Sequence, residues 1–169
     1  MASVPFDQLE GFIWMNGQFV NWADAKVHVL THGLHYASAV FEGERAYGGE
    51  IFKLTEHTER LAHSARMLDF EIPYSVAEID AACNALIRAM NITEGYVRPV
   101  AWRGSEMMGV SAQSNSINVA IAAWEWPSYF DPAERLRGIE LRRHTVLRTD
   151  AEAGRRLLSR SGQRPAAPG

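Results

Sequence analysis

The stretch Gly95-Tyr-Val-Arg-Pro-Val-Ala-Trp-Arg103 is the clearest strand in the sequence. Side chains of a strand alternate between its two faces. Here the alternation separates a face with aromatic and cationic side chains from a small apolar face: Tyr96, Arg98, Val100 and Trp102 against Val97, Pro99 and Ala101. Residues 116–124 are almost continuously apolar, which predicts a second strand covered on both faces. The loop between them, residues 104–115, is long enough to carry a function.

Two hairpins are predicted ahead of these strands. Asn16-Gly17 separates the short apolar stretches 13–15 and 18–20. Asn-Gly favours a type I′ turn, because both central residues of that turn need positive φ. Residues 38–47 and 50–54 flank Gly48-Gly49, which predicts the turn of a second hairpin.

Two helices are predicted between the hairpins and the two strands. Thr55 is expected to cap a helix over residues 56–69. Ser75 and Glu78 have the spacing of a capping box, which satisfies the first backbone N–H groups of the following helix. Apolar residues then recur at helical spacing and predict its buried stripe: Val76, Ile79, Cys83, Leu86, Ile87 and Met90. Cys83 lies within that stripe, which favours a packed thiol over a nucleophile.

The fold class predicted from this order is α+β, an antiparallel sheet with two helices packed on one side. We expect one domain over residues 1–141, with a last strand near 138–141. Residues 142–169 carry seven arginines against Asp150 and Glu152 and contain no aromatic residue. They are expected to form a basic, poorly ordered tail, or at most a short helix over 151–159.

Composition and sequence pattern argue against several classes of function. The 169 residues carry a formal net charge of −3, which speaks against a nucleic-acid partner or an anionic membrane surface. No apolar run reaches the length needed to span a bilayer, and no signal-peptide pattern begins the sequence, so a cytoplasmic location is expected. One cysteine allows neither a disulfide framework nor a cysteine-based zinc site. His28 and His32 are four residues apart, but no carboxylate completes a ligand set, so we expect no metal site.

Aromatic side chains from several elements accompany a single cation. Together they could line an apolar pocket with one fixed positive charge, which suits a small acidic or zwitterionic ligand: Tyr36, Phe41, Tyr96, Arg98, Trp126 and Tyr129. The residues alone leave a second interpretation open, since aromatic residues on strands are usually core residues.

An ordered series of motifs resembles the opening of branched-chain aminotransferases, enzymes of fold type IV that use pyridoxal 5′-phosphate. The motifs run collinearly from about residue 11 to residue 141: Ile13-Trp-Met-Asn-Gly17, Ala25-Lys-Val-His-Val29, His32-Gly-Leu-His-Tyr36, Val40-Phe-Glu-Gly43 with Arg45, His57-Thr-Glu-Arg60-Leu-Ala-His-Ser64, Tyr96-Val-Arg98-Pro99 and Gly109-Val110. The resemblance implies the small N-terminal domain of that fold, amino acid and 2-oxo acid substrates, and a homo-oligomer.

The resemblance also implies roles for the charged and hydroxyl-bearing residues. Arg60 matches the arginine that binds the cofactor phosphate, a task that suits an always-charged, two-pronged donor. Tyr96 matches the tyrosine that helps to hold the substrate α-carboxylate. Arg98 and Tyr36 match the pair that accepts the distal carboxylate of glutamate.

Further roles follow from the same resemblance. Three side chains match those that enclose the branched aliphatic group: Phe41, Trp126 and Tyr129. The loop residues Met108, Gly109 and Val110 match an interdomain loop that reaches the site of the neighbouring subunit. Gly43 and Arg45 match peripheral substrate-binding positions.

A lysine that bonds covalently to the cofactor is essential to this chemistry. The chain has two lysines, Lys26 and Lys53, and neither matches that position. The resemblance stops near Arg143, where the sequence becomes rich in Arg, Ala, Gly and Pro, so we hypothesise a truncated or frameshifted product that is inactive alone. A non-catalytic remnant that acts in dimerisation or binding, and a D-amino acid or amine aminotransferase of the same fold, are the alternatives.

Overall fold

The computed structural model describes residues 4–126 and 136–138. The chain divides into two units, residues 1–128 and residues 129–169, and the elements below all belong to the first. The predicted strand at 138–141, apart from Gly138, and the predicted tail helix at 151–159 lie outside the described residues. No helix within the described ranges is long and apolar enough to cross a membrane.

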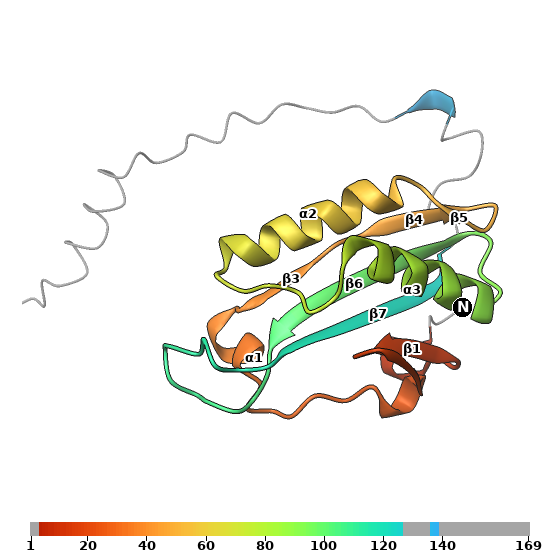
Figure 1. Cartoon of the computed structure of the whole chain (residues 1–169). Helices are drawn as coiled ribbons and strands as arrows, with labels where there is room; N and C mark the ends of the chain where they lie inside the picture. The colour runs from red at the N-terminus through yellow and green to blue at the C-terminus, as the bar shows by residue number, and fades with distance from the viewer. Residues whose placement is uncertain (1–3, 127–135, 139–169) are drawn as a thin grey trace, which may run out of the picture. The chain divides into compact units, whose positions relative to one another are not determined.

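All strand pairs of the sheet are antiparallel, in the order β2-β1-β7-β6-β4-β5, with β3 also paired to β6 (Figure 1). The strands are β1 (Phe12–Met15), β2 (Gln18–Asn21), β3 (Ala39–Phe41), β4 (Glu44–Tyr47), β5 (Glu50–Ile51), β6 (Gly95–Arg103) and β7 (Ile117–Glu125). Both predicted hairpins are confirmed. Asn16 and Gly17 have φ values of 49° and 96°, as the turn requires.

One predicted strand, residues 38–47, is interrupted at Glu42-Gly43. The register is the same on both sides, with Phe41 opposite Val100 and Glu44 opposite Val97. The Glu42 backbone N–H donates to the carbonyl of Pro99 at 3.0 Å. Proline has no N–H that could donate back to the Glu42 carbonyl. One hydrogen bond of the ladder is therefore missing here, and the register is unchanged.

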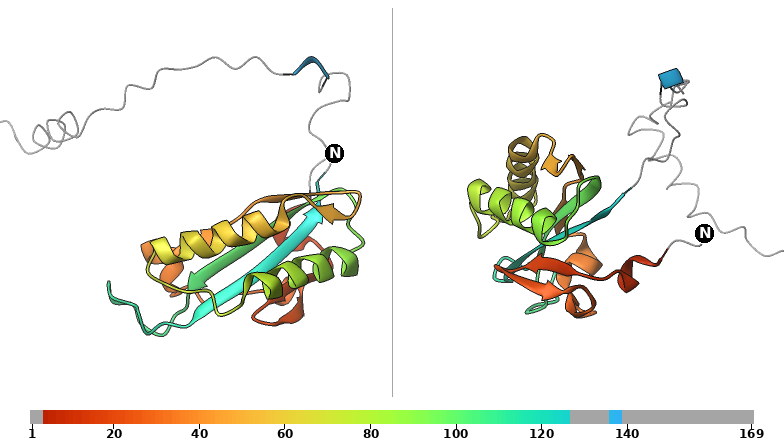
Figure 2. Two further views of the ribbon diagram at one scale, coloured as in Figure 1. Left: turned by 45° about the horizontal axis from the view of Figure 1, so that its top comes forward. Right: turned by 90° about the vertical axis from the view of Figure 1, so that its right-hand side faces the viewer.

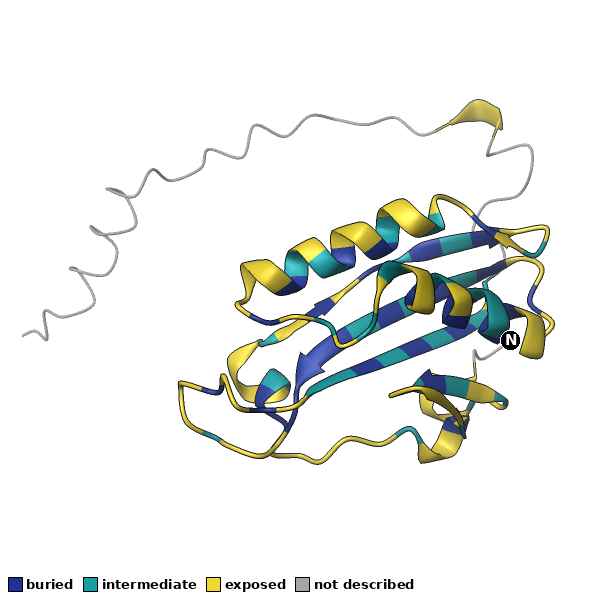
Figure 3. Cartoon of the chain, viewed as in Figure 1, coloured by how far each residue is buried: buried dark blue, intermediate teal, exposed yellow. Residues whose placement is uncertain are grey.

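Two long helices, α2 (Leu54–Met67) and α3 (Val76–Ala89), cover one face of the sheet (Figures 1 and 2). Their buried faces meet the small apolar side chains of β6 and β7, and Figure 3 shows this layer as the buried part of the molecule. The capping box is confirmed, since the Ser75 side chain accepts from the Glu78 backbone and the Glu78 side chain from the Ser75 backbone. Cys83 is fully buried, as predicted.

The predicted cap of α2 is wrong. The helix begins at Leu54, and the residue before it, Lys53, has a left-handed conformation and no side-chain cap. The Thr55 hydroxyl instead donates to Asp80 of α3 at 2.7 Å, so it ties the two helices together.

The opposite face of the sheet is only partly covered, which corrects the prediction for residues 116–124. A third, short helix, α1 (His32–Tyr36), and the segment before it lie over this face (Figure 2). They leave an apolar hollow of about 340 Å³. Its lining includes Val27, Leu34, Arg98, Val100 and Ala120.

Candidate functional site

Arg98 is the centre of the predicted cluster. Its guanidinium carbon lies 4.3 Å from the ring centre of Phe41 and 5.2 Å from that of Tyr96. Nη2 donates to the Tyr96 hydroxyl at 2.9 Å, whereas Nε is buried and has no partner among the described residues. A cation held against two rings, with no carboxylate beside it in the described part of the chain, can bind an anionic ligand through its N–H donors.

Tyr96 packs directly against Gly43. A Cβ at that glycine would overlap the Tyr96 hydroxyl, so the close approach depends on the missing side chain. Phe41, which lies on the same face of the sheet, is 60% exposed. The cluster is therefore open to solvent at its Phe41 end and closed beneath the tyrosine.

Trp126 joins the same cluster, with its ring centre 4.9 Å from that of Tyr96. Arg45 Nη1 donates to the Trp126 carbonyl at 3.0 Å, so Arg45 fixes the backbone that carries this ring. Trp124, which the sequence did not single out, lies 5.1 Å from Tyr96 and extends the aromatic wall. Tyr129 lies outside the described residues.

Arg60 lies on α2 and does not contact this cluster. Its Nε and Nη2 donate at 2.6 Å to the two carboxylate oxygens of Glu42, and His57 Nδ1 is 2.9 Å from the same carboxylate. The hydrogen bonds from Arg60, with His57 adding to them, hold the pKa of Glu42 below its usual value against the opposing effect of burial. Sequence reasoning missed Glu42 and His57, because only the packing of α2 against β3 brings them together.

The arrangement around Arg60 fits a phosphate group. The guanidinium side chain is 62% exposed, and Glu42 occupies only the Nε and Nη2 edge. A guanidinium has five N–H donors, so the Nη1 edge is available to two phosphate oxygens while the carboxylate fixes the orientation. Glu42, which holds the arginine of α2, is followed directly by Gly43, the glycine against which Tyr96 packs.

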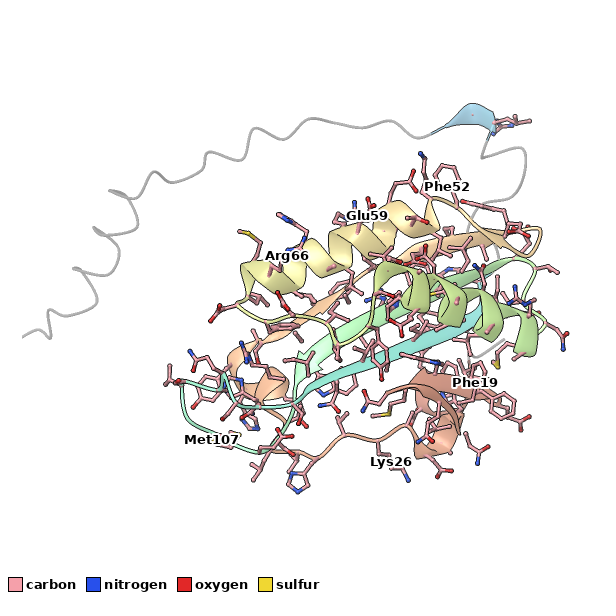
Figure 4. The ribbon with its side chains drawn as sticks, viewed as in Figure 1. Phe19, Lys26, Phe52, Glu59, Arg66 and Met107 are labelled. Carbon is pink, nitrogen blue, oxygen red and sulfur yellow. The ribbon has the colours of Figure 1, made fainter. Side chains whose placement is uncertain are left out.

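Tyr36 belongs to a different group of contacts. Its hydroxyl donates to the Met108 carbonyl at 3.2 Å, so it meets the 104–115 loop. Gly109 and Val110 follow in that loop, and the Val110 side chain is 86% exposed. Met107, labelled in Figure 4, marks the position of the loop at the end of the sheet.

The two lysines lie away from these groups. Lys53 Nζ bonds Glu56 at 2.6 Å at the start of α2. Lys26 is exposed on the segment that leads towards α1 (Figure 4).

The comparisons with known proteins identify the class. A profile of the family Amino-transferase class IV matches residues 39–156. This is more than half of the chain, which therefore belongs to that family. The predicted fold class is confirmed by the solved structures it resembles.

The individual relatives and solved structures that this chain resembles are branched-chain aminotransferases. The branched-chain-amino-acid aminotransferase of Pseudomonas aeruginosa is 44% identical over 143 residues, 82% of this chain and 47% of that protein. The enzyme of Escherichia coli K12 is 41% identical over 134 residues, 76% of this chain and 43% of that protein. The T.th. branched-chain amino acid aminotransferase, solved with pyridoxamine 5′-phosphate, matches with a TM-score of 0.70 and 42% identity, covering 74% of this chain and 43% of that one. The chain spans less than half the length of these relatives.

Proposed function

We propose that this chain forms the small N-terminal domain of a pyridoxal-phosphate-dependent branched-chain aminotransferase, with amino acids and 2-oxo acids as its ligands. The observation that carries the proposal is Arg98. It is a half-buried cation whose buried Nε has no hydrogen-bond partner within residues 4–126, and it borders an apolar hollow. A carboxylate beside an aliphatic group is the ligand chemistry that matches both features.

In this proposal the residues of this chain bind three anionic groups: two substrate carboxylates and the phosphate of the cofactor. Arg60 holds the phosphate of the cofactor through the guanidinium edge that Glu42 leaves available. Tyr96 holds the substrate α-carboxylate, and Arg98 with Tyr36 accepts the distal carboxylate of glutamate. The cofactor, when bound, supplies the electron sink for amino transfer.

Apolar side chains select the aliphatic substrates. Phe41 and Trp126 enclose the branched group, with Tyr129 as the third member of the set. Burial of a leucine side chain against such walls contributes roughly 1.5–3 kcal/mol, so leucine and its 2-oxo acid are favoured over smaller substrates.

The proposal includes a homo-oligomer. Tyr36 bonds the tip of the loop, Met108–Val110, and no hydrogen bond or ring contact joins either of them to the Arg98 cluster among the described residues. In this proposal they complete the site of a second copy. The exposed apolar side chains nearby, including Val29, Leu34 and Val110, would be covered in such an assembly.

Ligand binding to the full chain tests this function. We expect pyridoxamine 5′-phosphate and 4-methyl-2-oxopentanoate to shift the amide NMR signals of residues 41–45 and 96–98. Arg60→Gln should weaken binding of the phosphate compound about tenfold, a loss near 1.4 kcal/mol. Arg98→Gln should do the same for 2-oxoglutarate, which carries the distal carboxylate that Arg98 accepts. Arg66→Gln, an exposed change on α2, is the matched control and should alter neither.

Activity requires a second experiment, because the chain matches less than half of its relatives. Residues 11–126 can replace the equivalent segment of the Pseudomonas aeruginosa enzyme. Leucine-dependent formation of glutamate from 2-oxoglutarate by this chimera supports the proposal. A folded chimera that binds cofactor but transfers no amino group from leucine would contradict it and favour the non-catalytic remnant.

A further inference from the structure

The tip of the 104–115 loop is held by two side chains of α1. Tyr36 Oη donates to the carbonyl of Met108 at 3.2 Å, and His32 Nε2 lies 3.0 Å from the carbonyl of Gly109. These are consecutive carbonyls. Within residues 4–126, no other side chain bonds to the backbone of residues 108–110.

The geometry assigns the protons on His32. A carbonyl oxygen can only accept, so Nε2 carries the hydrogen and donates it to Gly109. Nδ1 lies 2.6 Å from the hydroxyl of Ser38, which donates to it when the ring is neutral. The imidazole is buried, with 3% exposed, and stacks on the ring of Tyr36 at 4.5 Å between centres and 23° between planes. His32 is therefore fixed on both nitrogens and on one face.

The base of the same loop is held independently. The buried Asn115 side chain donates to the carbonyls of Gly104 and Met107, and the buried Arg103 donates to that of Ala112. Because these contacts leave the tip untouched, loss of the His32 and Tyr36 contacts should release the tip alone.

We infer that His32 is a positioning residue, which acts with Tyr36 to hold Met108–Val110 so that the Val110 side chain points outward. The inference rests on the proposed function, in which this tip completes the site of a second copy. His32 acts through the loop backbone and does not contact the ligand. Its role is to fix one arrangement of the tip before the ligand and the second copy meet it, which lowers the ordering cost of binding.

Backbone ¹⁵N relaxation on the full chain tests the contact directly, because it reports how well the tip is ordered. His32→Leu should lower the order parameters of residues 108–111 from about 0.85 to below about 0.6, and Tyr36→Phe should lower them less. His32→Gln keeps an N–H donor at about the reach of Nε2 and should restore most of the order. His63→Leu makes the same change at an exposed position of α2 and should leave the tip unchanged.

The location of the effect separates positioning from general stability. Lower order parameters confined to the tip, with β6 and β7 unchanged, support the inference. Unchanged order parameters at the tip in His32→Leu overturn it, and so does an equal decrease throughout the sheet.

Binding of 4-methyl-2-oxopentanoate by the same variants tests the consequence. The affinity should fall about tenfold in His32→Leu and remain unchanged in His63→Leu. An unchanged affinity in a variant with a released tip overturns the positioning role. A wild-type chain that binds no oxo acid while its tip is ordered identifies failure of the proposed function instead.

Discussion

Glu44 carries a carboxyl group in the interior of the domain. It lies on β4, faces the helices, and is fully buried. Neither carboxyl oxygen has a hydrogen-bond partner among the described residues. Burial, with smaller contributions from the negative charges of Glu42 and Asp80, raises the pKa of Glu44 from 4.5 to about 8. The folded protein therefore keeps a proton at neutral pH that the unfolded chain has lost.

This difference in proton binding sets the sign of the pH dependence. Between pH 4.5 and 8 the folded state binds more protons, so the free energy of unfolding falls as the pH rises, by up to about 1.4 kcal/mol per pH unit. From pH 5.5 to 7.5 the loss is roughly 2–3 kcal/mol, a large part of a typical stability of about 5–15 kcal/mol. Glu42 has a lowered pKa and acts in the opposite sense, but only at pH values below the usual carboxyl range.

Urea unfolding followed by tryptophan fluorescence at pH 5.5, 6.5 and 7.5 measures this effect. Glu44→Gln keeps the size of the side chain and removes the titration, so its stability should lack the Glu44 part of the slope. Glu59→Gln, an exposed change on α2 (Figure 4), should keep the wild-type slope. The difference between wild type and variant removes the pH-dependent contributions that both proteins share. Equal slopes in Glu44→Gln and wild type would refute the reasoning.

Three further experiments test other parts of the structure. Gly43→Ala should displace Tyr96 and destabilise the fold by about 1–3 kcal/mol in thermal unfolding. Gly109→Ala should not, because its Cβ would make only ordinary van der Waals contact with the Ser111 backbone. Burial raises the pKa of the Cys83 thiol, so a disulfide reagent such as DTNB should react at least about 100-fold more slowly in the native protein than in urea. Arg103→Leu leaves two backbone carbonyls without their donor and should cost about 2–4 kcal/mol in urea unfolding; no change would show that water replaces the donor.

The sequence predicts those features that depend on neighbouring residues. The Asn16-Gly17 turn, the capping box at Ser75 and the alternation along residues 95–103 are local patterns, and the structure contains all three. The alternation also places Tyr96 and Arg98 on one face, which is the geometric basis of the predicted cluster.

Features that depend on tertiary packing could not be read in the same way. Thr55 has the composition of a cap, but its hydroxyl bonds a residue 25 positions away on α3. The pairing of Glu42 with Arg60 needs α2 to pack beside β3, and nothing in the spacing indicates it. The open face of β7 escaped prediction because its Ala120 and Ala122 are apolar whether or not another layer covers them.

Pro99 explains why Glu42 and Gly43 face different parts of the candidate site. Because it lacks an N–H, the strand opposite it is interrupted at Glu42-Gly43 while the register on either side is kept. One residue of that step turns its carboxylate towards Arg60 on the helix-covered side, and the next gives Tyr96 its space on the open side. The proposed phosphate and substrate groups thus share a single dipeptide. A ligand that reaches both must lie at the β3 edge of the sheet, where this step is located.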